Sequence, residues 1–201
     1  SSDVCSSDLS VLGSRATHLA SGVGGLSGRA LRAGDALSLG MSTHTQLASG
    51  QVSGAPGEGR NNGAGPTTLR VMRGPQDSHF PPEAFHRLLD TTFLVSARSN
   101  RMGYRLAGQG VPSAAGEMIS DATFPGGVQI PPSGEPILLM ADRQTTGGYP
   151  QLAVVISADL PRAAQLAPGD AVRFAETTRR EAIDALVSQE AQLRAMECHA
   201  S

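Results

Sequence analysis

LLMADRQTTGGYPQLAVVIS, residues 138–157, places a polar loop between two short apolar runs. The runs, residues 137–140 and 152–156, have the length of buried strands, and each begins shortly after a proline. The connection between them, residues 142–150, is longer than the roughly two to five residues of an ordinary hairpin loop. This stretch predicts two buried strands joined by a long polar loop.

The same pattern of short apolar runs bounded by glycine or proline continues on both sides of this stretch. A short helix is predicted to begin at Pro81-Pro82-Glu83 and to end near Leu89. Further strands are expected at residues 69–74, 93–98, 128–130, 136–141, 152–157 and 170–175. We therefore expect a mainly β fold, with an antiparallel, barrel-like domain over residues 67–176.

The C-terminal segment differs from the rest of the chain. Thr178 and Glu181 have the spacing of a capping box, and apolar residues follow at roughly helical intervals. An amphipathic helix is therefore predicted within residues 177–198. We expect Ile183, Leu186 and Leu193 to pack it against the outside of the barrel.

The composition narrows the class of protein. Apolar residues make up 39% of the chain and charged residues 17%, whereas glycine (24) and proline (13) are frequent, which favours strands and turns over a helical bundle. A net charge of −2 gives no electrostatic reason to expect binding to nucleic acid or to a membrane. The two cysteines predict no disulfide framework, and we expect a cytoplasmic protein. No lysine occurs, which excludes a Walker P-loop and a biotinylated lysine on these residues.

The N-terminal third suggests several separate segments. Residues 1–9, SSDVCSSDL, match the translation of a common sequencing-library adapter; we expect them to be an artefact and disordered, with the natural protein beginning upstream. Residues 41–66 are rich in glycine, serine, asparagine and proline, which predicts a flexible linker. Residues 31–37 and 166–172 share the pattern Leu-x-x-Gly-Asp-Ala-aliphatic, either by chance or because each closes a copy of the same domain.

Two polar clusters stand out as candidate binding segments. Ser99–Arg105 contains two arginines and a tyrosine. It is interpreted either as a solvated turn or as a binding segment for a carboxylate or phosphate. Asp142–Pro150 reads either as a long hairpin whose hydroxyls cap their own backbone or as a loop at the rim of a binding site. The candidate substrate-binding residues are Asn100, Arg101, Tyr104, Arg105, Asp142, Arg143, Gln144, Thr145, Thr146, Gly147, Gly148 and Tyr149. No catalytic residue and no metal ligand set can be assigned.

These clusters also carry a specific resemblance. Residues 74–76 (GPQ), 99–105 (SNRMGYR), 129–132 (QIPP), 140–150 (MADRQTTGGYP), 156–160 (ISADL) and 168–170 (PGD) occur in this order. The series resembles the biotin-dependent carboxyltransferase subunit family, also called KipA or the second subunit of allophanate hydrolase. The resemblance implies a cyclophilin-like β-barrel over residues 67–176, preceded in residues 10–40 by the end of a first similar subdomain. It also implies a fragment that lacks the family's N-terminal portion and is inactive alone.

The resemblance implies a component of an ATP-dependent 5-oxoprolinase complex, which converts 5-oxoproline to glutamate. The implied partners are a KipI-like subunit and a LamB/YcsF-like subunit, with this chain binding and positioning the small-molecule substrate. No cofactor is expected on this chain itself, whereas ATP is used by the complex. Two alternatives stay open: a carboxyltransferase component of urea carboxylase or allophanate hydrolase, which would use carboxybiotin, and a regulatory protein that binds a kinase inhibitor.

Overall fold

The computed structural model describes residues 11–37 (except 12, 15 and 20), 65–114 and 119–198. The chain divides into two units, Ser1–Gly50 and Gln51–Ser201, and each is considered by itself. The adapter-like residues 1–9 and nearly all of the expected linker, residues 41–64, lie outside the described residues. The disorder expected of residues 1–9 and the flexibility expected of residues 41–66 therefore stay predictions.

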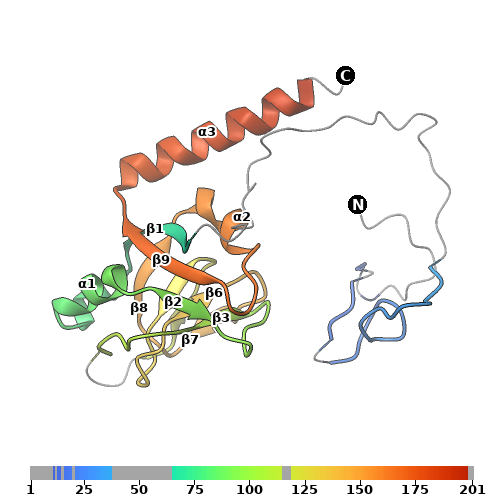
Figure 1. Cartoon of the computed structure of the whole chain (residues 1–201), viewed down its shortest axis with the longest axis horizontal. Coiled ribbons are helices and arrows are strands. Elements are labelled where there is room, and N and C mark those ends of the chain that lie inside the picture. Colours follow the sequence, from blue (N-terminus) through green and yellow to red (C-terminus); the bar gives the residue numbers. More distant parts are fainter. Residues whose placement is uncertain are drawn as a thin grey trace. The chain divides into compact units, whose positions relative to one another are not determined.

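The second unit is built around a closed barrel of seven strands, as the mainly β pattern predicted (Figure 1). Neighbouring strands follow the order β1-β8-β5-β6-β3-β2-β9 around the barrel. A separate two-stranded ribbon consists of β4 (Asp121–Ala122) and β7 (Thr146–Gly147). The barrel strands are β1 (Thr67–Arg73), β2 (Phe93–Val95), β3 (Gly103–Ala107), β5 (Gly127–Gln129), β6 (Ile137–Leu139), β8 (Gln151–Val155) and β9 (Ala171–Glu176).

The barrel closes through its first and last strands. β1 pairs with β9 in parallel, with Thr67 opposite Val172 and Val71 opposite Glu176, whereas the other barrel pairings are antiparallel. Closure satisfies the backbone donors and acceptors that an open sheet leaves at its edges.

Alternating side chains of the strands fill the barrel. Leu69 and Val71 of β1, Leu106 of β3 and Leu152 of β8 are almost completely buried in one apolar cluster. Burying side chains of this size contributes about 1.5–3 kcal/mol each, so this cluster is the main source of stability. Successive side chains of a strand point to opposite faces of the sheet. The residues between these core positions therefore lie on the outer face of the barrel, where a binding site can form.

Helices cover parts of the barrel. α1 (Glu83–Asp90) buries Ala84, Phe85 and Leu88 against the core, in the place expected from the Pro-Pro-Glu start. η2 (Asp77–His79) precedes α1, and η3 (Ser157–Asp159) with α2 (Leu160–Ala163) follows β8.

The C-terminal helix, α3 (Arg179–Cys198), is present as predicted, with its capping box formed. Glu181 Oε2 accepts from the Thr178 backbone N–H at 2.8 Å, and Thr178 Oγ1 accepts from the Glu181 N–H at 3.2 Å. The expected packing is wrong in its extent, because Ile183, Leu186 and Leu193 are 51%, 45% and 45% exposed. Contact between α3 and the rest of the unit is concentrated at η3, so a helix of this length cannot bury its whole stripe.

The two Leu-x-x-Gly-Asp-Ala segments adopt the same turn. Asp35 accepts a hydrogen bond from the Arg32 N–H at 2.7 Å, and Asp170 accepts one from the Ala167 N–H at 2.8 Å. Gly34 and Gly169, which directly precede these aspartates, have φ of +92° and +93°. A positive φ at the same position explains why both segments carry glycine there. The sequence echo therefore reflects a shared local geometry, while assigning residues 10–40 to a first subdomain stays a prediction.

Candidate functional site

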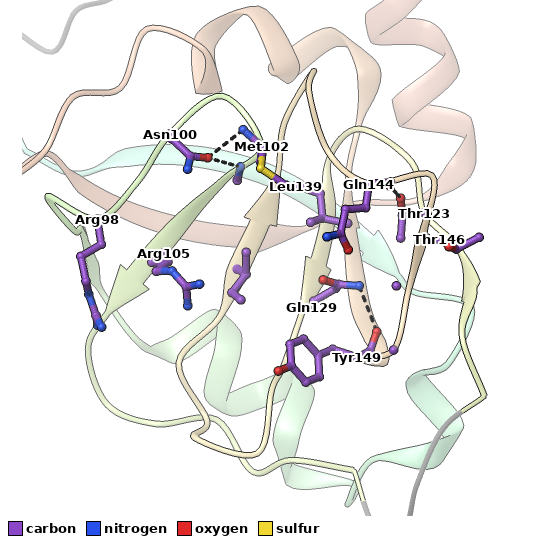
Figure 2. A pocket seen from close by; sticks show the side chains of 14 residues that line it. Arg98, Asn100, Met102, Arg105, Thr123, Gln129, Leu139, Gln144, Thr146 and Tyr149 are labelled. Carbon is purple, nitrogen blue, oxygen red and sulfur yellow. Dashed lines mark hydrogen bonds between the residues drawn. The ribbon is translucent and has the colours of Figure 1, made fainter. Parts of the chain in front are cut away.

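A cleft of about 270 Å³ lies on the outer face of three neighbouring strands, β3, β6 and β5 (Figure 2). The segment after β6 and the β4–β7 ribbon contribute the remaining walls. The cleft is lined by Arg98, Asn100, Met102, Gly103, Arg105, Thr123, Gln129, Ile137, Leu139, Gln144, Thr146, Gly147, Gly148 and Tyr149. Residues from two distant polar segments thus meet in one cavity.

Strand alternation decides which side chains reach the cleft. On β3, Leu106 is buried in the core, and Tyr104, two residues earlier, packs against the same core. Arg105 lies between them and faces outward into the cleft. Tyr104 and Arg105 are neighbours in sequence but occupy opposite faces of the strand. Burial raises the pKa of the Tyr104 phenol above its ordinary value.

The two polar segments singled out in the sequence lie side by side. β3 pairs with β6, which places Gly103 opposite Leu139. Beyond the strand ends the pairing continues, because the Asp142 N–H donates to the Arg101 carbonyl at 3.0 Å. Arg101 and Asp142 also form an ion pair at 2.7 Å, and the Arg101 side chain is 80% exposed. This pair joins the segments at the surface, outside the cleft lining.

Asn100 shapes the turn that leads into β3. Its Oδ1 accepts hydrogen bonds from the Met102 N–H at 2.9 Å and from the Gly103 N–H at 3.4 Å. This is local turn chemistry, as one of the two interpretations of the segment required. The same turn places Asn100 and Met102 in the lining of the cleft. The interpretation as a turn and the interpretation as a binding segment are therefore both partly right.

The opposite wall is held by contacts between the polar loop and the segment before β5. Thr123 donates from its N–H to the Thr145 carbonyl at 3.0 Å and from its hydroxyl to the Gln144 carbonyl. Gln129 Nε2 donates to the Tyr149 carbonyl at 3.1 Å. The polar loop is therefore anchored by β pairing and by side chains, unlike a free hairpin end.

Gly147 fits this close packing without displacing the Gln129 side chain. A Cβ at this position would lie 2.7 Å from Gln129 Nε2 and 3.1 Å from Thr123 Cγ2, so the Gln129 side chain would have to shift. The glycine lets the β4–β7 ribbon sit directly on the outer face of β5.

The charge in the cleft is positive. The Arg105 guanidinium forms no ion pair or hydrogen bond with the described residues. The Arg98 guanidinium forms an exposed ion pair with Glu135 at 3.5 Å. Guanidinium groups bind carboxylates and phosphates through paired hydrogen bonds, and Ile137 and Leu139 add an apolar surface. The arrangement suits a small anion with an apolar body.

The predicted site residues divide into two groups. Five do not line the cleft: Arg101 and Asp142 pair with each other, Tyr104 packs on the core, Thr145 contributes its carbonyl to the ribbon, and Arg143 has a buried Nε without a hydrogen-bond partner among the described residues. Those that line it are Asn100, Arg105, Gln144, Thr146, Gly147, Gly148 and Tyr149.

Sequence reasoning missed half of the lining residues. Arg98 lies at the end of one predicted strand and Gln129 within another, so neither was predicted to be a site residue. A polar residue in an otherwise apolar strand was the available signal at Gln129, since such a residue faces outward. The other missed residues are Met102, Gly103, Thr123, Ile137 and Leu139.

The described part of the chain offers neither a metal centre nor a membrane-spanning helix. No group of three or more His, Cys, Asp and Glu side chains is arranged to hold a metal ion there. None of the helices in that part is both long enough and apolar enough to cross a membrane.

Comparison with known proteins agrees with this architecture. The family described as "Carboxyltransferase domain, subdomain A and B" matches residues 8–176. The chain belongs to this family. Carboxyltransferase relatives include the C subunit of 5-oxoprolinase from Escherichia coli, 36% identical over 181 residues, covering 90% of this chain and 56% of the relative. The corresponding protein of Haemophilus influenzae is 36% identical over 172 residues, covering 85% of this chain and 53% of the relative.

The carboxyltransferase fold is also seen in a solved structure. The urea carboxylase of Kluyveromyces lactis superposes with a TM-score of 0.68 at 24% identity, covering 92% of this chain and 18% of that one. At this identity the likeness concerns the fold. This chain spans just over half the length of the two bacterial relatives.

Proposed function

We propose that this chain is part of the C subunit of a 5-oxoprolinase and that its cleft binds 5-oxoproline. The observation that carries the proposal is the 36% identity to the Escherichia coli C subunit over 90% of this chain. The complex would add water across the ring amide, breaking the C–N bond to give glutamate in a reaction coupled to ATP hydrolysis. This chain would bind and position the substrate.

The chemistry of the cleft supports this assignment. 5-Oxoproline is a small five-membered ring with one carboxylate, and the cleft combines the guanidinium of Arg105 with the apolar side chains of Ile137 and Leu139. A charge-assisted hydrogen bond in such a site contributes about 1.5–3 kcal/mol. Holding the ring in one orientation lowers the entropic part of the barrier to its opening.

Other components of the complex would supply the remaining chemistry. The 201 residues contain no lysine, so a Walker-type ATP site and a lysine-linked biotin would have to lie elsewhere. The relative's designation as one lettered subunit implies further subunits, and we propose a KipI-like subunit and a LamB/YcsF-like subunit as the partners. The carboxyltransferase role in urea metabolism is the outcome to expect if 5-oxoproline is not the substrate.

The test uses the whole protein that contains this chain, assembled with its KipI-like and LamB/YcsF-like partners. ATP-dependent release of glutamate from 5-oxoproline should be measured for wild type, Arg105→Gln and Arg101→Gln. We expect Arg105→Gln to lower kcat/KM by about ten- to a hundredfold, because it removes one charge-assisted contact. Arg101→Gln is the matched control, since it removes an exposed arginine outside the cleft lining and should change kcat/KM less than about threefold. No glutamate release by the wild-type complex would refute the proposal.

A further inference from the structure

Gln129 has a fixed amide orientation on the outer face of β5. The residue is 6% exposed, and its Nε2 donates to the Tyr149 carbonyl at 3.1 Å. A backbone carbonyl only accepts hydrogen bonds, so the NH₂ end of the amide must face Tyr149. The usual ambiguity between the two ends of a glutamine amide is therefore resolved by the partner.

The orientation leaves the amide oxygen of Gln129 facing the cleft. Figure 2 shows this oxygen on the side away from Tyr149, toward the space between the cleft walls. Among the described residues, Oε1 receives no hydrogen bond. Unlike Gln151 Oε1, the Gln129 oxygen is not a fully buried atom, so it is accessible from the cleft to a ligand that supplies an N–H.

Arg105 stands across the cleft from Gln129. In Figure 2 the Arg105 guanidinium points from β3 into the same space that the Gln129 oxygen faces. One wall therefore offers a cation and the other a hydrogen-bond acceptor, above an apolar floor from β6. A ligand complementary to both walls carries a carboxylate and, on a different atom, an N–H.

We propose that Gln129 is the specificity residue of this cleft and that it selects a lactam carboxylate by accepting a hydrogen bond from the ring N–H. Arg105 binds the carboxylate of the same molecule. The inference rests on the proposed function and assigns the recognition of the ring to one side chain. A lactone of the same ring, in which oxygen replaces the N–H, would bring an acceptor against the Gln129 oxygen, and two acceptors repel.

The experiment compares the lactam and the lactone in the assembled complex. KM for 5-oxoproline and the inhibition constant of the lactone carboxylate should be measured for wild type, Gln129→Met, Thr123→Val and Arg105→Gln. The wild-type complex should prefer the lactam by at least about tenfold. Gln129→Met keeps the side-chain volume but replaces the amide oxygen with a thioether, a weak acceptor, so it should weaken the lactam about tenfold or more and leave the lactone within about threefold.

The other two variants separate recognition from scaffold effects. Thr123→Val removes a hydrogen bond of the same wall without changing the acceptor, and Arg105→Gln removes the carboxylate partner; each should weaken lactam and lactone equally. Equal weakening of both ligands by Gln129→Met would show that Gln129 only supports the loop, which overturns this inference but not the proposed function. A wild-type complex that binds the lactone as tightly as the lactam would overturn it even if the variant did not fold. A wild-type complex without activity on 5-oxoproline would overturn both.

Discussion

Asp159 accepts three hydrogen bonds from Arg70, a residue that lies 89 positions earlier in the chain. The donors are the Arg70 backbone N–H at 2.8 Å, Nε at 3.0 Å and Nη2 at 2.6 Å. The Asp159 side chain is 1% exposed, whereas Arg70 reaches solvent. This carboxylate therefore fixes η3 to the middle of β1.

The Asp159 contact predicts a stability change with a defined pH dependence. Burial alone would raise the pKa of Asp159, but the hydrogen bonds from Arg70 outweigh it and leave the pKa below its ordinary value. A lowered pKa in the folded state gives stability that is present above about pH 4 and is lost as the pH falls through the folded pKa.

We expect Asp159→Asn to lower the free energy of unfolding by about 3 kcal/mol at neutral pH, since it leaves Arg70 without its buried partner. Urea unfolding should be followed at pH 7 and at acidic pH, where the deficit should shrink. Asp184→Asn is a suitable control because Asp184 and its partner Arg180 are both largely exposed. An equal deficit at both pH values would contradict the assigned ionisation.

Gly74 predicts a steric effect at the end of β1. A Cβ at Gly74 would lie 2.1 Å from the backbone oxygen of Gln151, which cannot move without disturbing the β1–β8 pairing. We expect Gly74→Ala to destabilise the domain by about 1–3 kcal/mol, as overpacking does. Gly110→Ala, whose nearest neighbour would lie 4.0 Å away, should be close to neutral in the same unfolding measurement.

The N-cap of α3 predicts a local effect. Thr178→Ala removes the oxygen that accepts from the Glu181 N–H and should cost about 1 kcal/mol. Amide hydrogen exchange in the first turn of α3 should report the loss directly. Ser188→Ala, in the middle of the same exposed helix, should instead leave the helix unchanged or slightly more stable, because alanine is the better helix former.

Tyr104 predicts a spectroscopic signature of its position in the core. Its pKa is raised by burial, so its phenol should ionise above about pH 10. Alkaline titration of phenolate absorbance in wild type and in Tyr104→Phe gives, by difference, the titration of Tyr104 alone. An ordinary or lowered pKa in that difference curve would place Tyr104 in solvent or beside a cation, contrary to its packing against the core.

The parts of the fold that sequence predicted are those with a large apolar signal. Apolar runs such as residues 152–156 are buried on one or both faces and end at glycine or proline, so composition marks them. β3 was not predicted, because the strand is short and its outward-facing Arg105 gives the segment the polar composition of a turn. β4 and β7 have two residues each, too short to carry any periodicity.

The cleft was predictable only in part, because it is defined by neighbours across the barrel. The polar loop and the Ser99–Arg105 segment could be singled out from composition. Which strand lies between β3 and β5 depends on the closed order of the barrel, and Gln129 enters the cleft only through that order. Similarly, Tyr104 and Arg105 could not be separated until β3 was known to be a strand.

The parallel pairing of β1 with β9 has a consequence for synthesis of the protein. Thr67 pairs with Val172, so roughly one hundred residues must leave the ribosome after β1 before its partner exists. Until then β1 and β2 each expose one unpaired edge in the nascent chain, and such edges pair readily with other chains. Aggregation during expression should therefore depend on how quickly residues 171–176 follow, and truncation just before β9 should be more harmful than loss of the entire α3 helix.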